Sequence, residues 1–126
     1  VALALFVNKE KHQKHRDSLK TLEDKTDAEA LTALKKEFPP VDVADFVDHI
    51  DYIKNKIGID HVGISSDFDG GGGIEGWKDA SETFNVTLEL VKRGYTEEEI
   101  SKIWSGNLLR VLDETAKIAS ELQKAK

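Results

Sequence analysis

The chain contains, near its middle, the apolar stretch Ile59-Asp60-His61-Val62-Gly63-Ile64-Ser65-Ser66, followed by Asp67-Phe68-Asp69 and four glycines, Gly70 to Gly73. Ile59, Val62 and Ile64 make residues 59–66 apolar over the length of one strand, which is typical of a strand buried on both faces of a parallel sheet. Val1 to Val7 is a second apolar run of strand length. Strands that alternate with helices pair in parallel through crossovers, so the sequence predicts an α/β fold.

Helices are predicted before the middle stretch. Lys9 to Lys36 is very polar and favours helical pieces that break near residues 24–27, and Pro39-Pro40 ends this region. Asp42 to Lys56 has the clearest helical period, with Asp42 as N-cap and Gly58 just past the carboxyl end. Apolar residues at spacings of three and four form one stripe on this helix, and they are Val43, Phe46, Val47, Ile50, Ile53 and Ile57.

Three more helices are predicted after the glycines. The first runs from Glu82 to Arg93 and stops at Gly94. The second, Glu97 to Trp104, begins with a capping box formed by Thr96 and Glu99, and Glu97-Glu98-Glu99 suits a helix start. Ser105-Gly106-Asn107 is predicted to break it, with Asn107 as the N-cap of a last helix that runs to the end of the chain. The residues of this last helix expected to face inward are Leu108, Leu109, Val111, Leu112, Ile118 and Leu122.

Composition excludes several classes of protein. The chain has 126 residues, 18 Lys and Arg against 24 Asp and Glu, a net charge of −6, and neither Cys nor Met. No apolar run reaches the roughly 20 residues that cross a bilayer. The lack of Cys excludes disulfides, thiolate zinc sites and cysteine nucleophiles, and the acidic balance argues against a nucleic-acid partner. The missing Met, and two strands that need neighbours, predict a segment of a longer chain.

Asp67 is the candidate catalytic residue. It follows the predicted strand at its carboxyl end, where barrels and open α/β sheets place their catalytic groups. The glycines after it would let the backbone pass close to a substrate. In a second interpretation, Asp67 and Asp69 cap the next turn and the glycines are a flexible connection. Phosphate binding is disfavoured, because no Lys follows the glycines as in a phosphate-binding loop.

Other polar and aromatic residues have simpler interpretations. No histidine stands in a metal-binding pattern, and solvated or structural roles are predicted for His12, His15, His49 and His61. Trp104 keeps helical register with Ile100 and Ile103, which predicts a core position. Trp77, in the loop after the glycines, is compatible with either a core position or a substrate contact.

Several separated motifs resemble one known family in the order in which they occur. Asp45-Phe46-Val47-Asp48-His49-Ile50-Asp51-Tyr52-Ile53, residues 58–70, Arg93-Gly94-Tyr95-Thr96-Glu97-Glu98 and Ser105-Gly106-Asn107-Leu108-Leu109-Arg110-Val111 resemble the carboxyl-terminal part of the membrane dipeptidase family. These are the zinc peptidases similar to renal dipeptidase. The resemblance is close from Val41 to Thr115, and Lys9 to Pro40 is similar to the longer bacterial members.

The resemblance implies a (βα)8 TIM barrel of the amidohydrolase superfamily. Val1 to Val7 would lie near strand seven, Ile59 to Ser66 would be strand eight, and the terminal helices would follow. Residues 1–126 would be the carboxyl-terminal fragment of a single peptidase barrel domain, with residues 9–40 as a helical insertion after the first strand. Family members hold two zinc ions with ligands from earlier strands, and no residue of this sequence matches a metal ligand. Asp67 matches the aspartate that ends strand eight, so the resemblance carries over a catalytic role for Asp67 alone.

The function implied is that of a segment of a zinc-dependent dipeptidase, which hydrolyses dipeptides and is inactive as a fragment. Its expected partners are the dipeptide substrate and the remainder of the barrel, and a homodimer is compatible with this interpretation. The sequence assigns neither a compartment nor a membrane association. Two alternatives stay open: a related amidohydrolase that acts on N-acyl amino acids or lactones, and a non-catalytic helical interaction module.

Overall fold

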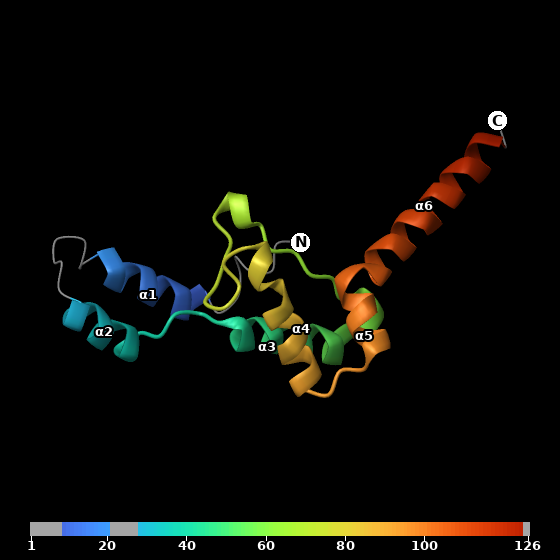
Figure 1. Cartoon of the computed structure of the whole chain (residues 1–126). Helices are drawn as coiled ribbons and strands as arrows, with labels where there is room; N and C mark the ends of the chain where they lie inside the picture. Colours follow the sequence, from blue (N-terminus) through green and yellow to red (C-terminus); the bar gives the residue numbers. More distant parts are fainter. Residues whose placement is uncertain (1–8, 21–27, 125–126) are drawn as a thin grey trace.

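A computed structural model describes residues 9–20 and 28–124, with only part of the side chains in its first two helices (Figure 1). Short helices connect the longer ones along the chain. The α-helices are α1 (Lys9–Lys20), α2 (Ala28–Glu37), α3 (Val43–Ile57), α4 (Thr83–Lys92), α5 (Glu97–Ser101) and α6 (Asn107–Lys124). The short elements are the 3₁₀ helices η2 (Ile59–His61), η3 (Phe68–Gly70) and η4 (Ala80–Glu82), and the π-helix η5 (Lys102–Gly106).

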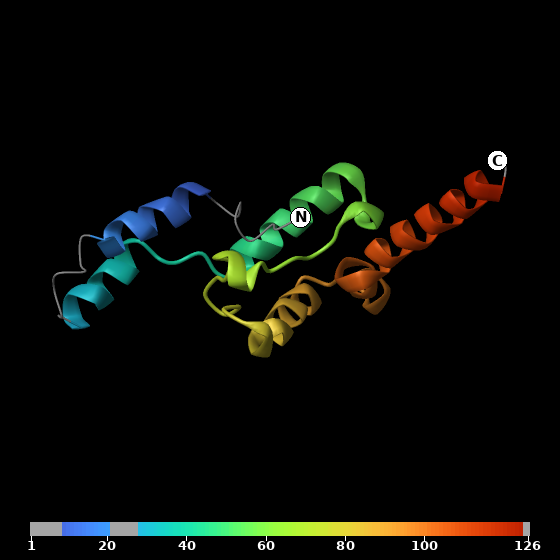
Figure 2. The same cartoon turned by 90° about the horizontal axis from the view of Figure 1, so that it is seen from above.

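The helices are arranged along an extended body. α3 packs against α4 at its centre, and α1 packs against α2 at one end. At the opposite end α6 continues from η5 and projects away from the other helices, as Figures 1 and 2 both show. No helix in the described part of the chain is long and apolar enough to cross a membrane.

The predicted ends of the central helices are confirmed. Asp42 accepts a hydrogen bond of 3.0 Å from the backbone N–H of Asp45, and the Asp45 carboxylate accepts one of 3.1 Å from the N–H of Asp42. This reciprocal capping box satisfies backbone donors that have no partner within the helix. Gly58 follows α3 with φ of 93°, and Gly94 follows α4 with φ of 82°, a conformation that glycine adopts without the strain of a Cβ.

The hydrophobic core lies where α3, α4 and the segment after η2 meet. Phe46, Val47 and Ile50 of the predicted α3 stripe are buried, whereas Ile57 at its end is 55% exposed. The remaining buried apolar residues are Val41, Val62, Ile74, Trp77, Val86, Leu90, Tyr95 and Ile103. This core supports the loop that carries Asp67, because Phe68 packs against it.

The predicted strand at residues 59–66 is corrected by the structure. Residues 59–61 form η2, and Val62 begins an extended segment, with φ of −98° and ψ of 133°. Within residues 9–20 and 28–124 no strand forms, and the ladder pairs reduce to two isolated bridges, Asp42 with Glu75 and Ile74 with Trp77. An extended segment becomes a strand only when a neighbour takes up its backbone hydrogen bonds. The predicted strand at Val1–Val7 lies outside the described residues.

Three predictions about the last helix and its start are also wrong. Ser105-Gly106-Asn107 does not interrupt the helical backbone, because the π-helix η5 joins α5 to α6. Asn107 has helical dihedral angles (φ −66°, ψ −41°) and is therefore not an N-cap. The residues expected to face inward, Leu108, Leu109, Val111, Leu112, Ile118 and Leu122, are all at least 50% exposed, because α6 projects away from the other helices (Figure 1).

Candidate functional site

Asp67 ends the extended segment in an unusual backbone conformation. Its φ of 55° and ψ of 42° place it in the left-handed region, and among the described residues it is the one non-glycine residue with positive φ. Asp and Asn tolerate this region better than other residues that carry a Cβ, but it still stores strain. The half-buried Asp67 is therefore held in a conformation that redirects the chain sharply at this point.

The glycines fold back over Asp67. Its carbonyl oxygen accepts hydrogen bonds from the N–H groups of Gly70, at 3.1 Å, and Gly72, at 2.7 Å. A Cβ on Gly70 would lie 2.4 Å from Asp67 Oδ1, and one on Gly72 would lie 2.1 Å from the Ser66 carbonyl oxygen. The atoms near Gly72 are backbone and cannot move aside, so glycine is required there, whereas a side chain at position 70 would force the Asp67 carboxylate to move. The glycines thus fold closely around the backbone of Ser66 and Asp67, and Gly70 lies beside the Asp67 carboxylate.

Trp77 contacts the loop that carries Asp67 through Phe68. It is 2% exposed, so the structure places it in the core, and its indole Nε1–H donates a 3.1 Å hydrogen bond to Thr83. The ring of Phe68, next to Asp67, meets the Trp77 ring edge-on at a centroid distance of 5.4 Å, and Phe46 lies 5.1 Å from it on another side. Trp104 packs against the core as predicted and completes the cluster at 6.2 Å. These aromatic contacts anchor the loop through Phe68.

Asn107 holds the opposite end of the extended segment. Its buried side-chain amide donates hydrogen bonds to the carbonyl oxygens of Ile59, at 2.7 Å, and Val62, at 2.8 Å. The N–H of Ile64 donates to the carbonyl of Ile103 in η5. A π-turn exposes different backbone groups from an α-helix and often occurs near functional sites. The segment that leads to Asp67 is thus tied to η5 and to the start of α6.

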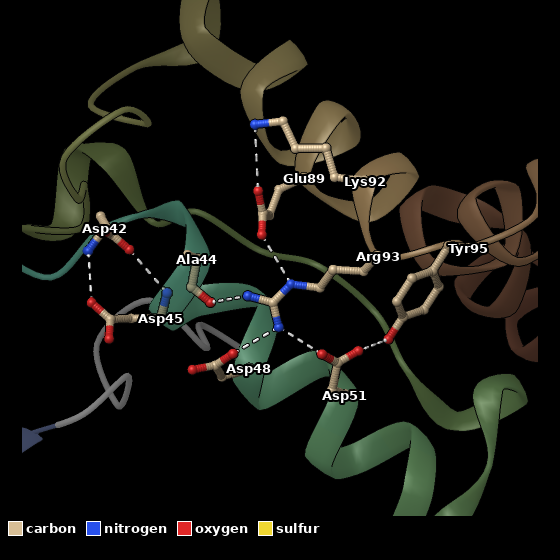
Figure 3. Close-up of polar contacts among 9 residues, drawn as sticks. All are labelled: Asp42, Ala44, Asp45, Asp48, Asp51, Glu89, Lys92, Arg93 and Tyr95. Atoms are coloured by element: carbon tan, nitrogen blue, oxygen red, sulfur yellow. Dashed lines mark hydrogen bonds and ion pairs between the residues drawn. The ribbon is translucent and has the colours of Figure 1, made fainter.

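A cluster of carboxylates surrounds Arg93 on the other side of α3 (Figure 3). The guanidinium donates to Asp48, at 2.7 Å, to Asp51, at 2.6 Å, and to Glu89, at 3.0 Å, and also to the carbonyl of Ala44. Burial works against the charged form, but the three carboxylates outweigh it and raise the pKa of Arg93 above its ordinary value. Figure 3 shows these groups converging between α3 and the end of α4.

Tyr95 adds a further contact to the same cluster. Its hydroxyl donates a short hydrogen bond to Asp51. Burial, together with this bond to a carboxylate, raises the pKa of Tyr95 above its ordinary value. Each of the three guanidinium nitrogens of Arg93 donates to a protein oxygen, so this cluster is a structural joint between α3 and the end of α4.

Comparison with known proteins identifies the family. The sequence profile described as "Membrane dipeptidase (Peptidase family M19)" matches residues 7–126. The chain belongs to the membrane dipeptidase family. Dipeptidase tcpJ of Claviceps purpurea is 39% identical over 79 residues, which cover 62% of this chain and 19% of the relative. Human dipeptidase 3 is 38% identical over 81 residues, which cover 63% of this chain and 16% of the relative.

A solved structure of a family relative agrees with this assignment. The crystal structure of the probable dipeptidase PvdM from Pseudomonas aeruginosa matches with a TM-score of 0.56 and 55% sequence identity. The match covers 66% of this chain and 21% of that structure. The chain thus spans about a fifth of the length of the membrane dipeptidases that it matches.

Membership of the membrane dipeptidase family implies zinc in the full enzyme, but the described residues do not fit a zinc site of their own. Nowhere in residues 9–20 and 28–124 do three His, Asp or Glu side chains gather in a group that could hold a metal ion. His61 is exposed on η2, at the opposite end of the extended segment from Asp67, and His49 is half-buried on α3. The side chains of His12 and His15 lie outside the described set.

The contacts that Asn107 and Arg93 make between elements of this membrane dipeptidase chain were not predicted from the sequence. Asn107 lies in the quoted Ser105–Val111 motif, but a polar residue after glycine is more often a cap than a buried amide. Arg93 opens another quoted motif, and the spacing of three between Asp48 and Asp51 places both carboxylates on one side of α3. That spacing was the available signal for a basic partner from a distant helix.

Proposed function

We propose that this chain is the carboxyl-terminal segment of a zinc-dependent dipeptidase that hydrolyses dipeptides. The observation that carries the proposal is the family match over residues 7–126. Three relatives named dipeptidases match at 38–41% identity, and each of these matches covers more than three fifths of this chain. We further propose that zinc ligands come from outside the described residues, and that the chain by itself does not hydrolyse dipeptides.

In this proposal the chain forms the last part of a single (βα)8 barrel. Residues 62–66 would be the end of strand eight, Val1–Val7 would lie near strand seven, and residues 9–40 would be a helical insertion. Val62 supports this assignment, since its dihedral angles (φ −98°, ψ 133°) are those of a strand and the segment needs only a neighbour to pair with. Residues 9–20 and 28–37 are helical, as an insertion of helices requires.

Asp67 is the proposed catalytic residue. It follows the extended segment, which corresponds to the carboxyl end of a barrel strand and hence to the face where barrel enzymes act. Its strained backbone supports the role, because residues in sparsely populated conformations cluster at active sites. Gly70 lies beside the carboxylate and has no side chain that would cover it.

The chemistry proposed for Asp67 is general acid–base catalysis. A carboxylate at this position can accept the proton of a water molecule that attacks the peptide carbonyl carbon. The same carboxyl group can then give a proton to the departing amine when the carbon–nitrogen bond breaks. In the full enzyme the implied zinc would supply Lewis-acid chemistry, and the described residues supply only the proton transfer.

Replacement of Asp67 by Asn tests this role cleanly. Asn tolerates the left-handed conformation and keeps the size of the side chain, but it cannot take up a proton. The test protein is a chimera in which residues 41–124 replace the matched part of the Pseudomonas dipeptidase, loaded with zinc. We expect Asp67→Asn to lower kcat for a dipeptide by about 10²–10⁴-fold, with an unchanged zinc content by metal analysis.

Asp69→Asn is the matched control, since Asp69 is an exposed carboxylate in the same loop. The control should keep most of the activity. A chimera with Asp67→Asn that retains dipeptide hydrolysis contradicts the assignment of Asp67. Turnover of N-acyl amino acids in preference to dipeptides would instead favour the related amidohydrolase.

A further inference from the structure

The last helix presents a broad apolar face that no described element covers. Its 18 residues extend over about 27 Å. Six large apolar side chains along it are 50–71% exposed, namely Leu108, Leu109, Val111, Leu112, Ile118 and Leu122. An exposed apolar surface of this length on one helix marks an interaction site. We call these six residues the α6 face.

The α6 face occupies about half of the helix circumference when the residues are placed at about 3.6 per turn. Ala116 and Ala119 fall within the same arc. A pair of helices in a coiled coil buries only a narrow seam, so pairing with one α6 of a second copy would leave much of this arc in water. A face this wide instead fits a layer of several elements, as on a globular domain.

The opposite side of α6 argues against a membrane surface. It carries three basic and three acidic residues, which are Arg110, Lys117, Lys124, Asp113, Glu114 and Glu121. Arg110 and Glu114 form an ion pair of 3.6 Å along the helix. Interfacial helices have basic polar faces that attract anionic lipids, whereas the charges of this face sum to zero and include an ion pair along the helix.

The α6 face continues into a hollow beside the extended segment. Leu108 and Val111 line a cavity of about 350 Å³ together with Ile64, Ile103 and Trp104. The covering partner would therefore contact both α6 and the segment that leads to Asp67. In Figure 1 α6 stands clear of the other helices, so the approach to this surface is open.

We propose that the α6 face and the adjoining cavity are the docking surface for the remaining polypeptide of a membrane dipeptidase. The relatives are about five times longer than the part that this chain matches, which is ample chain to form a multi-element layer. The proposal rests on the proposed function in that it takes the partner from the same family. It adds which surface of this chain the partner covers.

The test compares two double variants with matched loss of helix propensity. Leu112→Ser with Ile118→Ser alters the α6 face, and Lys117→Ser with Glu121→Ser alters the polar side of the same helix. In the Pseudomonas chimera we expect the face variant to lower the Tm by at least about 5 °C more than the polar variant does, because buried apolar side chains are lost only there. In the chain by itself, the two should differ little, since the face is already exposed.

Light scattering of the 126-residue chain provides the second measurement. A mass of one chain that no variant changes supports the proposal. A dimer mass that falls only in the face variant overturns it in favour of a second copy, and binding to anionic vesicles lost in the face variant overturns it in favour of a membrane. Equal Tm shifts in the chimera, or a chimera that does not fold, also overturn it. Neither readout depends on hydrolysis, so a stable but inactive chimera contradicts the proposed function alone.

Discussion

Asp67 and the glycines after it constrain one another atom by atom. Gly71 and Gly73 have φ of 92° and 116°, which lets the chain turn at these two positions. Gly70 and Gly72 allow the loop backbone to lie close to residues 66 and 67, since a Cβ at either position would collide with Asp67 or Ser66. Two different physical requirements thus alternate along the four glycines, and together they set the path of the loop around Asp67.

Gly72→Ala is expected to destabilise the chain. Its Cβ would lie 2.1 Å from the Ser66 carbonyl oxygen, which is backbone and cannot rotate away. Overpacking of this kind costs roughly 1–3 kcal/mol of unfolding free energy. Gly63→Ala is the control, because a Cβ on Gly63 would meet nothing within 4 Å. Thermal unfolding followed by circular dichroism measures both variants. Equal unfolding midpoints for the two variants would show that the glycine loop can rearrange without loss of stability.

Arg93 connects two elements, since it ends α4 and reaches Asp48 and Asp51 on α3. Its side chain is 22% exposed, so these pairs are partly shielded from solvent. A guanidinium can meet three carboxylates and a carbonyl at once because its donors lie in a planar fork. The joint therefore depends on the shape of the group as well as on its charge.

Arg93→Lys is expected to weaken the contact between α3 and α4. Lysine keeps the charge but cannot bridge the four acceptors, so the unfolding free energy should fall by roughly 1–3 kcal/mol. Lys92→Arg, next to it on the exposed side of α4, should have an effect within about 0.5 kcal/mol. Urea unfolding monitored by tryptophan fluorescence gives both values. An Arg93→Lys variant with the unfolding free energy of the parent chain would mean that Arg93 contributes charge alone.

Elements that carry their own boundary signals were predictable, and those that depend on a neighbour were not. α3 was predicted nearly to the residue, because Asp42, the apolar period and Gly58 are all local signals. The strand at 59–66 depends on pairing that these residues cannot supply to themselves. The inward face of α6 failed for the same reason, since periodicity indicates an apolar side without indicating what covers it. Asp67 was singled out from its place after the stretch, but its left-handed backbone needed coordinates.

Ion pairs connect elements that are not neighbours in the sequence. Lys11 of α1 pairs with Asp45 of α3, Lys54 of α3 pairs with Glu99 of α5 at 2.7 Å, and Lys102 of η5 pairs with Asp60 of η2 at 3.1 Å. The Lys54 ammonium also lies 4.0 Å from the centre of the Tyr95 ring. An extended molecule buries a small core relative to its surface area. Ion pairs therefore contribute more to the orientation of its helices than they do in a compact domain.

These pairs predict how stability responds to acid. Hydrogen bonding to Lys54, and to the N–H of Thr96, lowers the pKa of Glu99, and the pair with Lys102 lowers the pKa of Asp60. A carboxyl whose pKa is lower in the folded state stabilises that state at pH values above its unfolded pKa, which is about 4.3 for Glu. The stabilisation is lost as the pH falls through the lowered folded pKa. Unfolding midpoints should therefore be level at neutral pH and fall below about pH 4.3.

Glu99→Gln isolates the contribution of one pair to this acid response. Gln at the third helical position can still complete the capping box with Thr96, so the substitution removes the charge and keeps the cap. The variant should start with a lower midpoint at neutral pH and decline less steeply than the parent chain below about pH 4.3, because it has no carboxyl left to protonate there. Glu97→Gln removes a charge from the same turn at an exposed position and should keep the parent slope. Thermal melts at half-unit steps from pH 7 to pH 2 measure all three chains, and parallel curves for the parent and Glu99→Gln would show that the Lys54 pair does not couple α3 to α5 in solution.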